Sequence, residues 1–230
     1  MAELAGAHVS RARIHDLLTQ EPLLPRAQVE PIGPAAVLLP QFAAAEAGVL
    51  CAQVQELLMR SPWRHMQTPG GQRMSVAMTN CGRAGWVSDR AGYRYQSVDP
   101  CSGRPWPAMP GGWASLAARA AVLAGFERFE PDACLVNRYE PGTRLSLHQD
   151  RNERDFSAPV VSVSLGLPAV FLFGGEHRDA AVGRVALFHG DVVVWGGPQR
   201  LAFHGIQPLA EGTHPETGRC RINLTFRHAL

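Results

Sequence analysis

The chain has 230 residues, 46% of them hydrophobic, which is enough to bury the core of one domain with a sizeable insertion. No apolar run is long enough to cross a bilayer, and the first 20 residues lack the pattern of a signal peptide. The five cysteines are scattered, with no Cys-x-x-Cys pair, which disfavours a zinc ribbon and a disulfide framework. We therefore expect a protein of the reducing cytoplasm, with no membrane partner.

The net charge of +2 conceals an uneven distribution of arginines. Between Arg60 and Arg104 there are seven arginines, opposed only by Asp89 and Asp99. A local excess of five positive charges predicts a surface that binds a polyanion.

The N-terminal half predicts an arm followed by helices and short strands. Residues 1–34 are rich in Ala, Pro and Arg without periodicity, as expected of a loose N-terminal arm. A short buried strand is expected at 37–39, and apolar residues spaced i, i+3, i+4 predict a helix over 43–59. Gly and Pro punctuate 61–112, where we expect strands at 74–79 and 93–97. A second helix is expected over 113–124, ended by Gly125.

The C-terminal part, residues 133–230, contains eight short β-patterns separated by turn signals such as Glu140-Pro141-Gly142. The expected strands are 133–139, 145–150, 160–165, 169–173, 184–188, 192–195, 202–207 and 221–227. Eight such strands predict a sandwich or barrel, and the count matches a jelly roll with two helices available to cover one sheet.

A candidate metal site begins in residues 145–150, where polar and apolar side chains alternate. On a strand His148 and Asp150 would project to the same face. With a second imidazole they would form a two-histidine, one-carboxylate triad. His204, within an apolar run, is our preferred third ligand, and His189 is a competing one. By itself the pair also fits a core histidine and a turn aspartate, and the ligand types also permit zinc.

The last expected strand alternates perfectly between apolar and polar side chains, the polar ones being Arg221, Asn223, Thr225 and Arg227. A half-exposed strand with its arginines in water would show the same pattern. If helices cover the apolar face, however, the guanidinium groups point into the barrel, where they need anionic partners. A dicarboxylate bound to the metal would supply them. Asn137 and Tyr139, on one face of another strand, can donate hydrogen bonds to it.

Taken together, these motifs resemble the AlkB family of nucleic-acid dealkylases that depend on Fe(II) and 2-oxoglutarate, and are close to its bacterial members. The resemblance covers roughly residues 37–228. It is carried by His148-x-Asp150, His204, Arg221-x-Asn223-x-Thr225-x-Arg227, Asn137-Arg138-Tyr139 and the segments 68–71, 74–82, 105–110 and 189–197.

The resemblance implies a mainly β fold, a double-stranded β-helix (jelly roll, cupin-like) with flanking helices. It places a nucleotide-recognition lid within 35–132 and the catalytic core at 133–230. It implies that His148, Asp150 and His204 bind iron. The co-substrate contacts it implies are Asn137, Tyr139, Arg221, Asn223, Thr225 and Arg227, with Arg221 toward the distal carboxylate and Arg227 nearer the iron.

For the base, the resemblance implies contacts from Thr68, Met78, Trp86, Tyr93, Asn152 and Arg178. Trp86 and Tyr93 match lid aromatics, and Met78 matches an apolar wall. The chain departs from the family at Asn152, where bacterial members have an acidic residue, and at Gln72, which replaces an aromatic residue. The remaining tryptophans, Trp63, Trp106 and Trp195, are expected to be packing residues.

The implied activity is a DNA-repair reaction, the oxidative demethylation of bases such as 1-methyladenine and 3-methylcytosine. It would consume O₂ and 2-oxoglutarate and release formaldehyde, succinate and CO₂. The partner would be single-stranded or base-flipped DNA, with RNA left open, and we expect a monomer. Two rivals remain. A related oxygenase acting on a protein or small molecule would need no basic aromatic lid, and a non-catalytic jelly-roll binding module would not need the whole triad.

Overall fold

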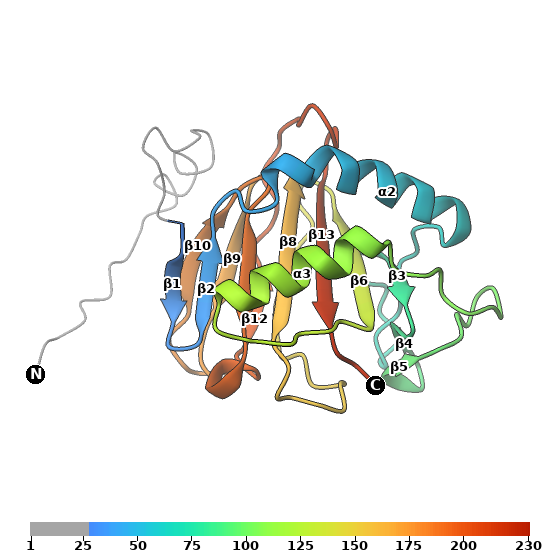
Figure 1. Ribbon diagram of the computed structural model, residues 1–230. Helices are drawn as coiled ribbons and strands as arrows, with labels where there is room; N and C mark the ends of the chain where they lie inside the picture. Colours follow the sequence, from blue (N-terminus) through green and yellow to red (C-terminus); the bar gives the residue numbers. More distant parts are fainter. Residues whose placement is uncertain (1–27) are drawn as a thin grey trace, which may run out of the picture.

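Two antiparallel sheets form the centre of the computed structural model, which describes residues 28–230 (Figure 1). The strands are β1 (Glu30–Gly33), β2 (Ala36–Leu39), β3 (Ala77–Gly82), β6 (Ala133–Tyr139), β7 (Leu145–His148), β8 (Val160–Gly166), β9 (Ala169–Phe173), β10 (Gly183–Leu187), β11 (Val192–Trp195), β12 (His204–Ile206) and β13 (Arg221–Arg227). The larger sheet has the order β1-β2-β11-β8-β13-β6-β3, and the smaller sheet the order β10-β9-β12-β7.

The eight strands β6 to β13 divide equally between the two sheets, which confirms the predicted jelly roll. Most predicted boundaries agree within two residues, and β13 agrees at both ends. One predicted strand was placed wrongly, since β3 lies at 77–82 instead of 74–79. β7 begins as predicted but ends at His148, two residues before the predicted end. β1 and β2 extend the larger sheet, so part of the expected arm is a strand. Residues 1–27 of that arm lie outside the described residues.

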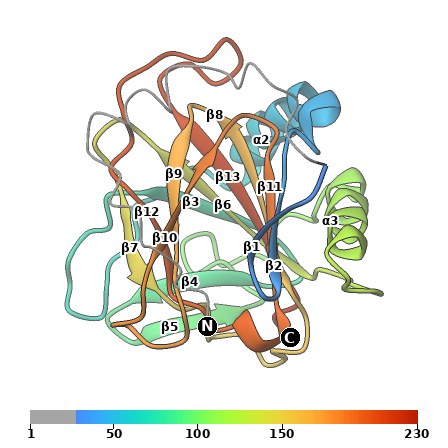
Figure 2. The same cartoon turned by 90° about the vertical axis from the view of Figure 1, so that its left-hand side faces the viewer.

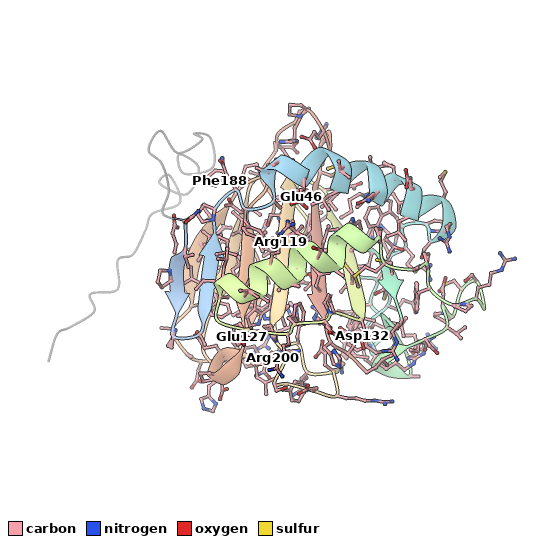
Figure 3. All side chains as sticks on the ribbon, in the orientation of Figure 1. Glu46, Arg119, Glu127, Asp132, Phe188 and Arg200 are labelled. Atoms are coloured by element: carbon pink, nitrogen blue, oxygen red, sulfur yellow. The ribbon has the colours of Figure 1, made fainter. Side chains whose placement is uncertain are left out.

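Two helices cover the outer face of the larger sheet, as predicted (Figure 2). They are α2 (Ala47–Arg60), preceded by the 3₁₀ helix η1 (Ala44–Glu46), and α3 (Gly111–Leu123). Trp113 of α3 packs edge-on against Phe226 of β13, with ring centroids 6.2 Å apart. An ion pair between Arg119 and Glu46 joins the two helical segments (Figure 3).

The cover of helices determines which way β13 faces. Ile222, Leu224 and Phe226 are buried in the core between the larger sheet and the helices. Because neighbouring side chains on a strand point to opposite faces, Arg221 and Arg227 point between the two sheets. The prediction that the polar face of this strand points inward is confirmed, since both arginines line the internal cavity.

A two-stranded hairpin stands at one end of the sandwich, formed by β4 (Gly85–Asp89) and β5 (Gly92–Gln96) (Figures 1 and 2). We call it the lid hairpin. β5 was predicted within one residue, whereas β4 was not predicted. Gly92 has a φ of 116°, a conformation that favours glycine in the turn between the strands. Next to this turn the guanidinium of Arg94 pairs with Asp89 at 2.8 Å.

All five cysteines are free thiols, in agreement with the prediction of no disulfide framework. Cys51, Cys81 and Cys134 are buried, as expected of small core residues, whereas Cys101 is exposed. Within residues 28–230 no helix combines the length and the apolar character that crossing a membrane requires.

Candidate active site

A cavity of about 740 Å³ opens between the two sheets and is bordered on one side by the lid hairpin. Strands of both sheets contribute to its wall, chiefly β13, β6, β7 and β12. Every residue predicted from the sequence to bind metal, co-substrate or base lines this one cavity. The residues come from positions 68 to 227, and the sheet pairing brings them together.

Three potential metal ligands meet in the cavity. His148, Asp150 and His204 each offer one ligand atom, and these atoms lie within 4.8 Å of one another. His148 and His204 are paired neighbours on β7 and β12, with ring centroids 4.3 Å apart. The competing candidate His189 lies elsewhere, 3.5 Å from Glu216, and does not belong to this group.

The two imidazoles are oriented by backbone carbonyls. Nδ1 of His148 lies 2.9 Å from the carbonyl oxygen of Ser146, and Nδ1 of His204 lies 3.0 Å from that of Ala202. A carbonyl oxygen only accepts, so each Nδ1 carries a proton, and in a neutral imidazole this leaves the lone pair of Nε2 for a metal. Burial, reinforced by His148, lowers the pKa of His204 to about 4, so this imidazole is neutral at pH 7.

Asp150 lies beyond the end of β7, so the prediction that it shares a strand face with His148 is wrong. Its position is fixed instead by two arginines from distant parts of the chain. Arg227 donates from Nε and Nη2 to the carboxylate at 2.9 and 2.6 Å, and Arg200 donates to the backbone carbonyl at 2.9 Å. Burial alone would raise the pKa of Asp150, but Arg227, His204 and His148 hold it below its usual range.

This donor set has the chemistry of an iron(II) site. Two imidazole nitrogens and one carboxylate oxygen lie close together and face a cavity with room for further ligands. Such an arrangement suits non-haem Fe(II), which needs open positions for a co-substrate and O₂.

Arg221 places a buried guanidinium group in the wall of the same cavity. Its side chain is 1% exposed, and its guanidinium lies 5.1 Å from the ring centre of Tyr139. Nη2 donates to the hydroxyl of Ser164 at 2.9 Å, but Nε and Nη1 have no hydrogen-bond partner among the described residues. Burial lowers the pKa of Arg221, although Tyr139 opposes the shift. A buried guanidinium with two unused donor nitrogens is costly unless an anion pairs with it, and a carboxylate has the matching shape and charge.

The other polar residues of β13 are engaged with the protein. Asn223 donates from Nδ2 to Ser162 and to the carbonyl of Val163, at 2.8 and 2.9 Å. Thr225 donates to Oδ1 of Asn223 at 2.8 Å. Asn223 and Thr225 therefore line the wall with their main hydrogen bonds already satisfied. On β6, in contrast, Oδ1 of Asn137 has no partner among the described residues.

The lid hairpin carries two aromatic rings at the mouth of the cavity. Trp86 and Tyr93 stack on each other, with centroids 5.6 Å apart and planes inclined by 14°. The indole N–H of Trp86 donates to Oδ1 of Asn152 at 3.0 Å, and Nδ2 of Asn152 lies 3.5 Å from the carbonyl of Tyr93. Asn152, the residue that departs from the family pattern, therefore contacts the indole of Trp86 and the backbone of Tyr93. Met78 is buried in the adjoining wall.

Polar and basic residues border the mouth. Thr68 accepts a hydrogen bond from the backbone of Gln72 at 3.2 Å. Arg178 is exposed, lies over the ring of Phe203 and donates to the carbonyl of Leu147 at 3.3 Å. Further exposed arginines at the mouth are Arg73, Arg144 and Arg151.

The arginine excess predicted for residues 60–104 is partly neutralised. Arg64 is paired with Asp99 and Arg94 with Asp89, so the two acidic residues of the segment each hold one arginine. Of the other five, Arg73 reaches the cavity mouth.

Four residues near the site were not predicted. Trp195 was expected only to pack, yet it lines the cavity with its ring 4.9 Å from that of His204. Tyr95, Glu153 and Arg200 form a buried polar network beside Asp150. No local pattern marks Tyr95 or Arg200, because their partners lie many residues away. Only Glu153 had a local signal, as an acidic residue three positions after Asp150.

Comparison with known proteins gives a consistent result. The family model described as the 2OG-Fe(II) oxygenase superfamily matches residues 35–227. Over 200 residues the chain is 56% identical to alpha-ketoglutarate-dependent dioxygenase AlkB of Escherichia coli, covering 87% of this chain and 93% of that protein. An AlkB homolog of Caulobacter vibrioides is 45% identical over 171 residues, 74% of this chain and 76% of that protein. The solved structure of OsALKBH1 superimposes with a TM-score of 0.75 at 29% identity, covering 86% of this chain and 99% of that one.

Proposed function

This chain belongs to the AlkB family within the 2OG-Fe(II) oxygenase superfamily, and we propose that it removes alkyl groups from N-alkylated bases of DNA. It is a dioxygenase that uses Fe(II), O₂ and 2-oxoglutarate. The observation that supports the substrate proposal is that three features share one cavity. They are the group of His148, Asp150 and His204, the Arg221 guanidinium without a carboxylate partner among the described residues, and the stacked aromatic rings at the mouth.

We assign Nε2 of His148, Nε2 of His204 and the carboxylate of Asp150 as the iron ligands. Support comes from the short distances between the ligand atoms. It also comes from the two backbone carbonyls, one for each imidazole, that accept a hydrogen bond from Nδ1. When bound there, iron and 2-oxoglutarate supply the oxidation, in which O₂ is consumed and the N-alkyl carbon gains a hydroxyl group. The hydroxylated group leaves as formaldehyde and the base is restored.

We assign Arg221 to the distal carboxylate of 2-oxoglutarate, because its two unused donors are buried in the same cavity. Tyr139 and Asn137 lie on the neighbouring β6, opposite Arg221 and Asn223, and line the same cavity. Arg227 lies at the metal end, where it holds Asp150. Asn223 and Thr225 shape the wall, and their hydrogen bonds keep the polar face of β13 in place.

For the base, we propose that the aromatic faces of Trp86 and Tyr93 hold a nucleobase removed from its stack. The alkylated nitrogen lies on the Watson–Crick edge, so the base must be single-stranded or flipped to enter. Met78 and Thr68 would border the base, and Asn152 would face its polar edge. Exposed arginines at the mouth, Arg178 among them, suit the phosphates of a DNA strand, and RNA offers the same groups.

We further propose that the protein repairs DNA in the cytoplasm as a monomer. The free thiols suit a reducing compartment. One chain supplies every residue of the cavity, so the site requires no second copy.

Formaldehyde release from a panel of alkylated oligonucleotides tests the proposal, with 1-methyladenine, 3-methylcytosine and 1-methylguanine as the lesions. Release should require both Fe(II) and 2-oxoglutarate, and omission of 2-oxoglutarate is the control. Turnover of 2-oxoglutarate without formaldehyde from any oligonucleotide would point instead to an oxygenase of proteins or small molecules.

A further inference from the structure

A buried network connects the lid hairpin to the candidate metal ligand Asp150. Arg227 donates to the carboxylate of Asp150 from Nε and Nη2, and its third nitrogen, Nη1, donates to the hydroxyl of Tyr95 at 3.3 Å. Tyr95 donates in turn to Oε1 of Glu153 at 2.9 Å. Tyr95 belongs to β5 of the lid hairpin, whereas Arg227 is the last residue of β13.

The network is closed on its other side by Arg200. Its Nη2 lies 3.2 Å from Oε2 of Glu153, and Nε of Arg227 lies 3.3 Å from Oε1. Two guanidinium groups and two carboxylates thus balance in charge, which permits their burial. Figure 3 shows Arg200 at the lower edge of the sandwich, the edge from which the lid hairpin extends in Figure 1.

Tyr95 differs from the other lid residues in what it contacts. The indole of Trp86 donates to Asn152 at the cavity mouth, and the Trp86 backbone bonds the side chain of Asn80 on β3. Ser88 donates to the carbonyl of Gln67. Only the Tyr95 hydroxyl, among the hydrogen bonds of the lid hairpin described here, reaches a guanidinium that holds Asp150. Burial raises the pKa of this hydroxyl well above its ordinary value, so it remains a donor.

We propose that Tyr95 is a positioning residue that couples the lid hairpin to the metal-binding carboxylate through Arg227. A shift of the lid hairpin that moves the Tyr95 hydroxyl changes the position of the Arg227 guanidinium, and with it that of Asp150. Conversely, metal binding at Asp150 fixes Arg227 and holds the lid hairpin in the position described here. The inference rests on the proposed function, because the ligand of the lid hairpin is taken to be a nucleic-acid base.

Such coupling is reciprocal and can be measured as a ratio of affinities. The affinity of a methylated oligonucleotide would be measured by fluorescence anisotropy without metal and with Mn(II) plus 2-oxoglutarate under anaerobic conditions, so that no turnover occurs. In the unmodified protein the two affinities should differ by about 5-fold or more, the low end of typical couplings. In Tyr95→Phe, which loses one hydroxyl, the ratio should fall toward one.

Ser88→Ala is the matched control, because it also removes one hydroxyl from the lid hairpin but not from the network. It should keep the ratio of the unmodified protein. An unchanged ratio in Tyr95→Phe, or an equal loss in Ser88→Ala, would overturn the inference. No binding of methylated oligonucleotide by the unmodified protein would instead contradict the proposed function.

Amide hydrogen exchange of the unmodified protein tests the same coupling without any variant. Mn(II) with 2-oxoglutarate, in the absence of nucleic acid, should slow exchange in residues 92–96. Exchange that slows around the metal ligands but not in this strand would contradict the coupling, even if Tyr95→Phe did not fold.

Discussion

The part of the cavity that carries His148, Asp150, His204, Arg221 and Arg227, here called the floor, is built differently from the lid hairpin. Most of the floor belongs to strands with neighbours on both sides, although β7, which carries His148, is an edge strand. The arginines of the floor, Arg221 and Arg227, are at most 5% exposed. The lid hairpin has only two strands, and Tyr93 is 45% exposed. Two strands alone are marginally stable in water, so this element depends on a few contacts with the core.

This contrast suggests a division of labour. Most residues that we assign to metal and co-substrate lie on paired strands from distant segments, and Asp150, which lies outside the strands, is held by Arg200 and Arg227. Such fixed positions suit chemistry that needs constant geometry. The residues that we propose to meet the base, Trp86 and Tyr93, lie on an element of only two strands. Changes in the floor should therefore affect metal and co-substrate binding, whereas changes in the lid hairpin should affect nucleic-acid affinity and selectivity.

The largest effect is expected from the metal ligands. His148→Ala should abolish formaldehyde release, a loss greater than the roughly 10- to 100-fold that removal of an outer-shell partner causes. The variant should also bind Mn(II) more weakly in calorimetry. His189→Ala is the control, because this histidine lies outside the metal group. Full activity in His148→Ala would remove the iron assignment.

The second prediction concerns Arg221. Arg221→Met removes the fork that we assign to the distal carboxylate. Hydrogen bonds to a charged group contribute about 1.5–3 kcal/mol, so KM for 2-oxoglutarate should rise roughly 10- to 150-fold. Because the buried guanidinium lacks a carboxylate partner, the ligand-free variant should melt at or above the temperature of the unmodified protein.

Thermal melting with and without 2-oxoglutarate separates the two parts of this prediction. The unmodified protein loaded with Mn(II) should gain stability from the co-substrate, and Arg221→Met should gain much less. Arg219→Met, which removes a surface arginine paired with Glu211, should behave as the unmodified protein does. A normal KM in Arg221→Met would show that the distal carboxylate binds elsewhere.

Some features of the floor could be predicted from the sequence and others could not. The alternation in residues 221–227 is a local pattern, and its prediction of an inward polar face is confirmed. Asp150 was grouped correctly with His148 and His204, but for a wrong reason, because the strand ends before it. Its true supports, Arg200 and Arg227, are 50 and 77 residues away, and no spacing rule connects them.

The lid hairpin was harder to predict from the sequence. β4 was missed because residues 85–89 mix glycine, an aromatic and polar residues instead of alternating clearly. Its pairing with β5 rests on a short turn at Gly92. The Tyr95–Glu153 contact joins two segments whose proximity follows only from the complete fold. The resemblance to a family pointed to Trp86 and Tyr93, but the stacking of these two rings on each other is visible only in the folded structure.

A smaller effect is expected from the lid aromatics. Trp86→Ala should raise KM for methylated single strands by roughly 10-fold, since stacking of a base on an aromatic ring contributes about 1–3 kcal/mol. Turnover of 2-oxoglutarate in the absence of nucleic acid should change little. Trp86→Phe keeps a ring but loses the hydrogen bond to Asn152, so it should recover most of the affinity. Equal KM values in all three proteins would contradict base stacking.

The smallest and most selective effect is expected from Asn152→Asp. The carboxylate can still accept from the indole of Trp86, but it has no donor for the nearby carbonyl of Tyr93. It also adds a negative charge at the cavity mouth. Because 1-methyladenine is cationic and 1-methylguanine is neutral, the charge should favour the first.

An ion pair of this kind contributes about 0.2–1 kcal/mol, so the ratio of 1-methyladenine to 1-methylguanine repair should rise about 1.4- to 5-fold. The ratio of kcat/KM on two otherwise identical oligonucleotides measures this directly. Ser157→Asp adds the same charge to an exposed residue of the same loop that does not line the cavity, and should leave the ratio unchanged. An equal shift in both variants would mean that general electrostatic attraction, and not contact with the base, sets the preference.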